Sequence, residues 1–588
     1  MSSLTPLDWF IVVASLVVAF APALWLARRA GSSTAEFFTS GQSAPWWLVG
    51  ISMVATTFST DTPNLVTDIV RRDGVAGNWV WWAFLLTGMA TVFFFARLWR
   101  RAGLLTDLEF YELRYSGRAA SFVRGFRAVY LGLFFNAFIM AAVNLAAVKI
   151  ANVLFGWPMG TTLLVCAAIS IVFAATSGLW GVMVTDMIQF GIAMTGAVAA
   201  AVYALRQPEV GGLDGLMARL PEDALRLVPD PSNGALFAAV FLIPLTVQWW
   251  SVWYPGAEPG GGSYIAQRIL ASRSEADAIG GTLLFNIAHY ALRPWPWILV
   301  ALASLLVYPD LAALQTALPH VDPKLVGHDM AYPAMVRFLP PGLLGLMVAG
   351  MLAAYVSTIS THLNWGTSYL VHDVYRRFVR ADAPEAHYVQ MGRIVTAALM
   401  VLAAALTFVL DSAKQAFDLL LSIGAGTGLL YLLRWFWWRI NAWCEVAAMA
   451  ASFLVALGFF ALSKQDVEVP THMALLLSVG ITTVVWLLAA FFGPSTRPEQ
   501  LAAFYAKVRP AGPGWAKVRA ETGLPPSPDS LPQALLAWTL GLFTVYGVLF
   551  GAGLLLYGDL VPGLAALAVG LVAGAGLARM LRAMQASG

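Results

Sequence analysis

The feature that most constrains this chain is its succession of apolar segments, each about 20 residues long, with most of the charge in the stretches between them. A helix of roughly 20 apolar residues crosses the hydrocarbon core of a membrane. Across 588 residues, 59% are hydrophobic and only 11% are charged, whereas soluble domains carry roughly 25% charged residues. So little charge cannot cover a water-facing surface of this size. The composition therefore excludes a soluble enzyme, a secreted scaffold and a disordered hub.

From segment length we predict an all-α membrane protein with about 15 transmembrane helices. Helices are favoured over strands because the segments are continuously apolar and rich in Ala, Leu and Gly, whereas a membrane barrel alternates over roughly ten residues. The predicted spans cover residues 9–27, 46–70, 79–100, 126–154, 160–178, 181–205, 235–255, 277–307, 342–372, 390–411, 414–435, 443–463, 472–492, 534–557 and 560–582.

Net charge and cysteine usage exclude further classes. The formal net charge of +3 is too balanced for a nucleic-acid-binding protein. The two cysteines, Cys166 and Cys444, lie in apolar runs without CxxC or CxxH spacing, so the sequence offers neither a disulfide framework nor a zinc knuckle. No nucleotide-binding P-loop and no kinase motif occurs, which argues against an ATP-driven pump and a fused sensor kinase.

Lysine and arginine are distributed unequally between alternate loops, and this bias predicts the orientation in the membrane. Placing the N-terminus outside puts most basic residues in the cytoplasm, including the cluster between Arg97 and Arg127 and the segment 493–533. The first span is not a cleaved signal peptide, because Arg28 and Arg29 follow its apolar stretch instead of preceding it. We predict a multi-pass protein of the inner (plasma) membrane with its N-terminus outside and its C-terminus in the cytoplasm.

The second predicted span, 46–70, carries a dense set of hydroxyl and carboxyl groups. Its sequence Asp61-Thr62-Pro63 disfavours a continuous helix, because proline lacks a backbone donor and clashes with the carbonyl four residues back. Carbonyls freed in this way are tolerated at membrane depth where they line a cavity, and broken helices bind cations in secondary transporters. We therefore predict a binding site at this break; the alternative is an ordinary proline kink capped by Ser and Thr hydroxyls.

Two further spans carry candidate cation ligands. In the ninth span, the adjacent hydroxyls of Ser357 and Thr358 offer two oxygens, the ligand type that hard cations prefer. Ser and Thr also bond the helix backbone or join helices, so this pair gains its weight from the broken second span. In the sixth span, Asp186 and Gln189 share a helix face. Asp186 either faces a wet cavity or a cation, or complements the helix dipole.

The seventh and eighth spans combine polar residues with helix breakers. After Gln248 and Trp249, the chain runs through the Pro- and Gly-rich residues 255–262, which cannot form regular helix. Arg293 in the eighth span has two readings. It either clamps a carboxylate or hydroxylated substrate, or it pairs with an internal acid or snorkels outward as a structural residue. Lys149, near the outer end of its span, is expected to snorkel.

Three stretches of the sequence resemble the sodium:solute symporter family, which includes sodium–glucose and sodium–proline cotransporters. The similarity covers about residues 9–460. The stretches are residues 178–189, with a glycine-rich turn, Trp180 and Thr185-Asp186; residues 264–276, with Gln267-Arg268; and residues 353–377, with Ser357-Thr358 and a terminal His372-Asp373-Val374-Tyr375-Arg376-Arg377.

The resemblance implies a LeuT-like fold, in which an inverted repeat of five plus five helices supports alternating access and sodium coupling. It divides the chain into an N-terminal extra helix and loop (1–44), a first repeat (45–205), a second repeat (206–440) and four C-terminal extra helices (441–588). A cytoplasmic linker at 493–533 interrupts the last part.

Carried over position by position, the resemblance also implies site residues. The sodium ligands are the backbone carbonyls of Ala55, Phe58 and Ala354 and the hydroxyls of Ser357 and Thr358, and Asp186 matches an acid linked to sodium binding or release. The substrate-facing positions are Thr57, Asp61, Thr62, Gln248, Trp249, His289 and Arg293. The chain departs from the sugar-transporting pattern, which has an amide-bearing first helix where Thr57 and Thr62 stand here and lacks the run 255–262. The family resemblance therefore does not name the solute.

The sequence predicts a sodium-driven symporter of a small organic solute, with sodium as coupling ion and no other cofactor. Its partners are the solute, sodium and the lipid bilayer, with no nucleic acid, and the choice between monomer and homo-oligomer stays open. One rival reading is proton coupling through Asp61 or Asp186. A second is a membrane-embedded enzyme using His289, His362 or His372, which the lack of an HExxH motif or nucleophile elbow disfavours. A third is a transporter-like sensor that signals through 493–533.

Overall fold

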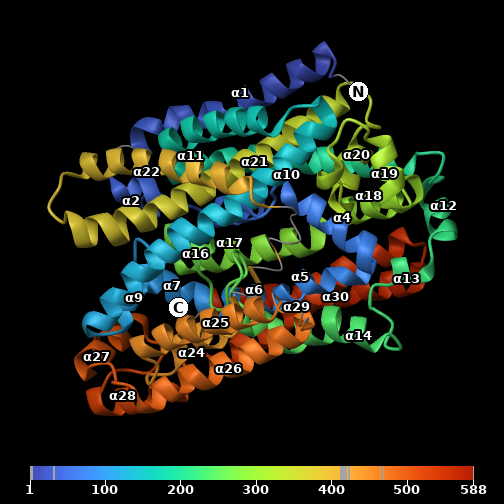
Figure 1. Cartoon of the computed structure of the whole chain (residues 1–588). Helices are drawn as coiled ribbons and strands as arrows, with labels where there is room; N and C mark the ends of the chain where they lie inside the picture. Colours follow the sequence, from blue (N-terminus) through green and yellow to red (C-terminus); the bar gives the residue numbers. More distant parts are fainter. Residues whose placement is uncertain are drawn as a thin grey trace.

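The computed structural model of the chain is all-helical (Figure 1). It describes residues 4–586 apart from 31–32, 411–416, 418–419, 422–423, 464, 466 and 468. Over this described part, extended backbone pairs only at two isolated bridges, Ala44 with Ser272 and Val252 with Ala425. The predicted all-α class is confirmed.

Within the described residues, eleven helical segments are long and apolar enough to cross a membrane. They are Val75–Ala102, Gly117–Phe155, Gly178–Leu205, Gly234–Ser251, Glu275–Val307, Leu343–Val379, Glu385–Thr407, Ala442–Phe459, Thr471–Phe492, Leu531–Leu556 and Leu560–Ala583. Three shorter apolar helices, Pro6–Ala21, Trp46–Thr56 and Met159–Ala174, fall within three more of the predicted spans. The remaining predicted span, 414–435, includes residues outside the described part of the chain.

In the first part of the chain, one predicted span, 46–70, is broken into two helices, and two others, 160–178 and 181–205, are joined in a single bent helix. Its α-helices are α1 (Pro6–Ala30), α2 (Thr34–Thr39), α3 (Trp46–Thr56), α4 (Asp61–Asp73), α5 (Trp79–Trp82), α6 (Phe84–Ala90), α7 (Ala96–Ala102), α8 (Phe110–Arg114), α9 (Gly117–Val129), α10 (Asn136–Phe155) and α11 (Met159–Leu205), with short 3-10 or π turns η1 (Ser40–Gln42), η2 (Val75–Asn78), η3 (Thr91–Phe95), η4 (Asp107–Glu109) and η5 (Tyr130–Phe135). α11 turns sharply at Gly178, whose φ of 56° and ψ of −176° suit glycine, so this helix contains two of the predicted spans.

The middle part contains the Pro- and Gly-rich run between two helices. Its α-helices are α12 (Gly212–Arg219), α13 (Glu222–Leu225), α14 (Gly234–Phe237), α15 (Trp249–Ser251), α16 (Ser263–Ala271), α17 (Glu275–Ile287), α18 (Pro294–Val307), α19 (Leu311–Ala317), α20 (Ala331–Val336), α21 (Leu343–Ser368) and α22 (Glu385–Thr407), with η6 (Ala238–Leu242), η7 (Pro244–Gln248), η8 (Ala288–Leu292), η9 (Pro323–Leu325), η10 (His328–Met330) and η11 (Tyr369–Val379). Because no helix forms over 252–262, the chain crosses this level of the bundle as extended backbone and turns.

The last part consists of two helical pairs and the segment between them. Its elements are α24 (Gly428–Phe436), α25 (Ala442–Ser463), α26 (Thr471–Phe492), α27 (Pro498–Val508), η12 (Pro513–Trp515), α28 (Ala516–Thr522), α29 (Leu531–Leu556) and α30 (Leu560–Ala586). The predicted linker 493–533 thus holds the short helices α27 and α28. α25 packs on α26, and α29 packs on α30.

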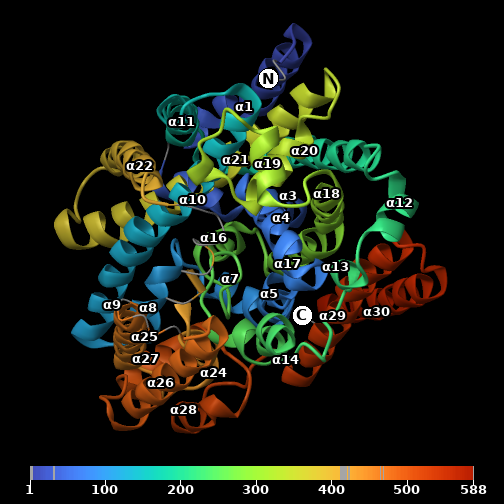
Figure 2. The same cartoon turned by 45° about the vertical axis from the view of Figure 1, so that its right-hand side comes forward.

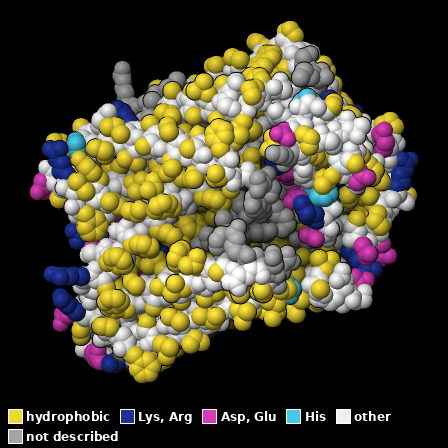
Figure 3. Space-filling model, viewed as in Figure 1, with side chains coloured by type: hydrophobic (Ala, Val, Ile, Leu, Met, Phe, Trp, Pro, Cys, Tyr) yellow, Lys and Arg dark blue, Asp and Glu magenta, His cyan; other side chains and the backbone are white. Residues whose placement is uncertain are grey.

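The surface is divided into an apolar band and two charged margins. In Figure 3, hydrophobic side chains cover the broad middle of the face, whereas Lys, Arg, Asp and Glu gather toward the left and right margins. Large apolar side chains such as Phe10, Val401 and Phe492 are exposed on the outer helices. An apolar band between charged margins matches a lipid bilayer and its two interfaces.

Four helices from three separate stretches of the sequence meet at the centre of the bundle. In Figure 2, α3, α4, α16 and α21 lie inside a ring that includes α22, α9, α26 and α29. α21 packs along α11, while α3 packs against both α17 and α11. The polar residues of these inner helices are therefore shielded from lipid by the outer ones.

Lys149 differs from its sequence-based prediction. The sequence predicts that this side chain snorkels, but it is only 2% exposed, and its Nζ lies 2.7 Å from the carboxylate of Asp329. The prediction is wrong because the loop between α18 and α21 packs against α4 and α10 and brings an internal counter-charge to the lysine.

Candidate functional site

The second predicted span is broken at its centre. α3 ends at Thr56 and α4 begins at Asp61, with non-helical backbone between them. Pro63 lies in the first turn of α4, where a missing backbone donor is tolerated. The Ala55 carbonyl accepts a 3.0 Å hydrogen bond from the Phe58 amide, and the Phe58 ring stacks on a tryptophan of α18. The break therefore turns backbone polar groups toward the interior of the bundle.

α21 lies directly against this break. The Thr358 hydroxyl donates a 2.8 Å hydrogen bond to the Thr56 carbonyl, and the hydroxyl oxygens of Thr56 and Thr361 are 3.0 Å apart. Ala354 and Ser357 lie within one turn of Thr358 on the same helix, and both are buried. The structure thus brings the predicted ligand segments, 55–58 and 354–358, into one buried polar cluster.

Asp186 joins the same cluster from α11. Its two carboxylate oxygens accept 2.5 Å hydrogen bonds, one from the Ser357 hydroxyl and one from the Ser52 hydroxyl. The carboxylate is 1% exposed and lies two turns beyond the bend at Gly178, outside the first turn of the helical segment that the bend begins. A hydroxyl that donates to a carboxylate keeps its lone pairs available as ligands. Asp186 is therefore placed to orient Ser357 toward a cation.

The positively charged side chain of this cluster is Arg268, for which the sequence predicts a different location. The charge bias of the sequence predicts that Arg268 lies on the cytoplasmic side, but the structure buries it completely in α16. Its guanidinium lies 3.7 Å from Asp186 and donates to three hydroxyls, those of Ser52 (2.8 Å), Thr56 (2.9 Å) and Thr361 (2.7 Å). The signal that marks it is the Gln267-Arg268 pair, which re-enters the bundle after the glycine run. Arg268 balances the charge of Asp186 in a region shielded from solvent.

A cavity of about 130 Å³ lies beside the break. Five of the predicted substrate-facing residues line it, namely Thr57, Asp61, Thr62, His289 and Arg293. Its aromatic walls come from Trp81, Phe84, Tyr254, Tyr264, Tyr290 and Phe417. A few convergent polar groups between aromatic walls are typical of small-molecule sites.

The other two predicted substrate residues lie elsewhere. Gln248 donates to the carbonyl of Val80 over 2.7 Å and lines a separate hollow of about 1310 Å³. Trp249 packs against Trp538. The helix ends soon after these residues, so the turn at 255–257, and not the helix before it, forms that wall of the central cavity.

Arg293 is held mainly by protein groups. One terminal nitrogen donates to the Val54 carbonyl and the Thr57 hydroxyl, both over 3.2 Å, and the other lies 2.6 Å from Nδ1 of His289. The guanidinium also lies 5.4 Å above the ring of Trp297. These contacts hold the broken end of α3 against the start of α18. Arg293 is buried and lines the cavity, and among the described residues it forms no ion pair, so it neither snorkels nor pairs with an acid as the structural reading expected.

Asp61 is the acid that faces the cavity. It begins α4, where the helix dipole favours a negative charge. One carboxylate oxygen is buried and has no hydrogen-bond partner among the residues that the structure describes. Arg293 is within electrostatic reach of this carboxylate but does not form an ion pair with it among those residues. The cavity therefore offers an acceptor to a solute that carries hydroxyl or ammonium donors.

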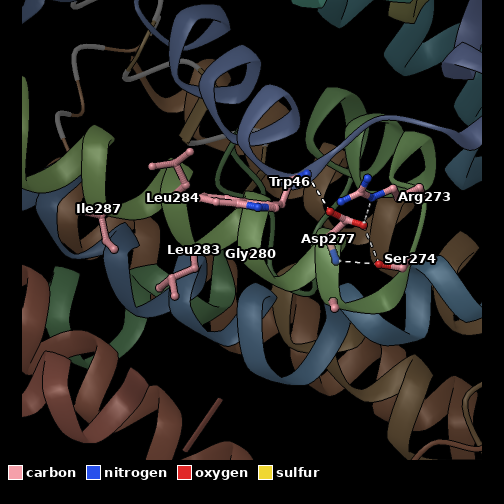
Figure 4. Close-up of a pocket in the computed structure, with 9 residues that line it drawn as sticks. Trp46, Arg273, Ser274, Asp277, Gly280, Leu283, Leu284 and Ile287 are labelled. Carbon is pink, nitrogen blue, oxygen red and sulfur yellow. Dashed lines mark hydrogen bonds and ion pairs between the residues drawn. The ribbon is translucent and has the colours of Figure 1, made fainter. Parts of the chain in front are cut away.

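A further hollow, distinct from the central cavity and from the one beside Gln248, lies along α17 near the start of α3 (Figure 4). Its walls are mostly apolar, and its polar groups bond one another. Asp277 accepts from the Trp46 amide (2.9 Å), from Arg273 (2.6 Å) and from the Ser274 hydroxyl (2.7 Å). These bonds cap α17 and anchor the start of α3, which accounts for the polar residues without a ligand.

Gly256 is a glycine that the cavity wall requires. Its φ is +81°, and an added Cβ would lie 2.3 Å from the Tyr264 hydroxyl oxygen. We expect Gly256→Ala to reduce solute uptake at least about tenfold, because the wall must shift to relieve the clash and the unfavourable φ. Uptake by reconstituted protein measures this effect. Gly480→Ala in α26, where an added Cβ meets nothing within 4 Å, is the matched control; equal uptake by both variants would contradict this role for Gly256.

Comparisons with known proteins agree with the geometry. The sequence profile of the sodium:solute symporter family matches residues 37–454. The sodium/glucose cotransporter of Vibrio parahaemolyticus is 25% identical over 452 residues, which cover 74% of this chain and 81% of that protein. Sodium/glucose cotransporter 2 of Rattus norvegicus is 26% identical over 457 residues, which cover 71% of this chain and 66% of that protein. Among solved structures, a substrate-bound, outward-open Na⁺-coupled sialic acid symporter shares the fold, with a TM-score of 0.67 and 16% identity over 84% of this chain and 99% of that one.

Proposed function

The chain belongs to the sodium:solute symporter family, and from this premise we propose that it uses the sodium gradient to take up a small polar solute by alternating access. It is a multi-pass membrane transporter and not an enzyme. The inward sodium gradient and the membrane potential together drive the cycle. The potential contributes about 2.3 kcal/mol per elementary charge per 100 mV.

The observation that carries the proposal is the bond between α21 and the broken helix, from the Thr358 hydroxyl to the Thr56 carbonyl. Sodium at this contact would take its oxygens from both elements: the carbonyls of Ala55, Phe58 and Ala354 and the hydroxyls of Ser357 and Thr358. A cation bound there favours the arrangement in which the two helices stay together. Because the central cavity shares the break, solute and sodium stabilise the same state, and their coupling is reciprocal.

The solute class follows from the cavity. At about 130 Å³ it is smaller than the roughly 300–1,000 Å³ typical of drug-sized ligands. Asp61 supplies an acceptor, and aromatic rings supply flat apolar walls. This combination favours a small solute with several hydroxyl groups, or one with an ammonium group, over an anion, since Arg293 spends most of its donors on the protein.

The proposed architecture follows the family resemblance in its finer details. We assign about 15 membrane-spanning helices, with an inverted repeat formed by 45–205 and 206–440. The flanking parts are 1–44 and 441–588. The excess of Lys and Arg on one side supports an orientation with the N-terminus outside and the C-terminus in the cytoplasm.

The experiment that tests the function is solute uptake into proteoliposomes, with a panel of sugars, polyols, amino acids and carboxylates and with sodium or choline outside. We expect uptake of one neutral or cationic class that requires sodium. An inside-negative potential of about 100 mV should raise steady-state accumulation about 50-fold for each sodium carried per cycle. Uptake that persists without sodium and vanishes with a protonophore at clamped potential would instead establish proton coupling.

A further inference from the structure

Glu258 is a buried acid that the proposed sodium and solute sites do not use. It lies in the Pro- and Gly-rich run between α15 and α16 and is 3% exposed. One of its carboxylate oxygens accepts a 3.1 Å hydrogen bond from the Gly256 amide. The other is buried without a hydrogen bond of standard geometry, and the Ser263 hydroxyl lies close to the carboxyl group. Among the described residues, Glu258 also forms no ion pair, and the carboxyl group of Asp107 nearby adds to the negative potential.

Glu258 lines a small cavity of about 10 Å³, about the space that one water molecule needs. The polar side chains that line it are Glu258 on the run, Thr91 on η3, and Thr282 and Asn286 on α17. Only a glycine fits opposite Asn286, because a Cβ at Gly88 would lie 1.8 Å from its side-chain oxygen. The backbone at Gly88 therefore lies close to the side-chain oxygen of Asn286.

Three of the four polar hydrogens on Thr91, Thr282 and Asn286 are donated to helix carbonyls and not into this cavity. The hydroxyls of Thr91 and Thr282 donate to helix carbonyls over 3.1 and 2.8 Å. The amide nitrogen of Asn286 donates to the Thr282 carbonyl over 2.8 Å, and the Asn286 oxygen has no partner among the described residues. Four side chains that carry acceptor oxygens, one of them a carboxyl group, therefore line a very small space, and the oxygens of Glu258 and Asn286 lack partners among the described residues. Burying such a set is costly unless a positive charge lies among them.

We infer that Glu258, Asn286, Thr91 and Thr282 bind a single sodium ion at a site separate from the cluster between α3 and α21. One carboxylate and three neutral oxygens match the charge and hardness of a monovalent cation. The ion would neutralise Glu258 and satisfy the Asn286 oxygen at once.

The site is linked to the central cavity through Gly256 and Ala257, which line both cavities. Gly256 donates its amide proton to Glu258 and also lines the central cavity, whose wall continues through Pro255 and Ala257. A cation at Glu258 therefore holds the wall against which the solute packs. Binding at this site is independent of the proposed transport function, and only its effect on the solute depends on that function.

The test is the sodium dependence of thermal unfolding of the full purified chain, with choline chloride keeping ionic strength constant. The background is the double variant Ser357→Ala with Thr358→Ala, which weakens the first cluster. We expect sodium still to raise Tm in this background, and adding Glu258→Gln to raise the half-maximal sodium concentration at least about tenfold. Asn286→Ala should act in the same direction, which covers the case that Glu258→Gln does not fold. Glu499→Gln, an exposed acid in α27, is the control.

Two results would overturn the inference while leaving the proposed function intact. One is a double variant whose Tm no longer responds to sodium, although that of the unmodified chain does. The other is a sodium response of Tm that Glu258→Gln leaves unchanged. If the effect of Glu258→Gln on Tm then depends on pH and not on the sodium concentration, Glu258 binds a proton and not sodium. A chain whose Tm never responds to sodium would count against both proposals.

Discussion

Replacing Ser357 and Thr358 together by alanine is expected to raise the sodium concentration for half-maximal uptake by about 10- to 100-fold. The double change removes two of the five proposed oxygen ligands and the hydroxyl that donates to the Thr56 carbonyl. It also leaves Asp186 with one hydroxyl partner fewer. Initial uptake rates over a series of sodium concentrations, at saturating solute and clamped potential, measure the effect.

The matched control removes two hydroxyls from exposed helix surfaces, with Thr195→Ala in α11 and Thr539→Ala in α29. In the structure, both of these hydroxyls bond only the carbonyl four residues back. We expect the control to keep its sodium dependence. If the variant at 357 and 358 did the same while folding normally, those hydroxyls would not be sodium ligands.

Asp61→Asn is expected to reduce solute uptake by about 10- to 150-fold, because a hydrogen bond to a charged group contributes about 1.5–3 kcal/mol. The asparagine keeps the size of the side chain but offers one neutral oxygen in place of a carboxylate. Solute-dependent stabilisation at fixed sodium, measured for the unmodified and the altered protein, reports solute binding alone. Comparing it with uptake separates lost binding from lost turnover.

Sodium-dependent stabilisation should survive in Asp61→Asn, since Asp61 is not one of the proposed sodium ligands. That readout shows that the altered protein is folded. Full solute affinity in this variant would remove Asp61 from the solute site, whereas loss of the sodium response together with solute binding would make its role structural.

The sequence indicated the centre of the site because its signals are local. A proline next to Asp61 in an apolar segment predicts a broken helix, and the structure interrupts that helix at residues 57–60. The Ser357-Thr358 pair has no local function that its spacing explains, and the structure places it against the break. Both inferences need only the rule that polar backbone in a membrane must be satisfied.

The parts that sequence reasoning missed depend on long-range packing. Arg268 follows a glycine run that looks like a loop, and only the tertiary fold returns it to the core beside Asp186. Lys149 meets its counter-charge in a loop that is distant in sequence. Gln248 leaves the central cavity because the chain abandons helical geometry a few residues later. The residue pattern within a single span does not predict where these three side chains lie in the fold.

The most direct test of the account is a cryo-EM map of the purified protein in sodium, compared with one in choline. We predict a density peak about 2.3–2.6 Å, the distance range of hard-cation–oxygen bonds, from the carbonyls of Ala55, Phe58 and Ala354 and the hydroxyls of Ser357 and Thr358. That peak should disappear in choline. Maps without density between the broken helix and α21, or with the same peak in both salts, would contradict the sodium site on which the proposed mechanism rests.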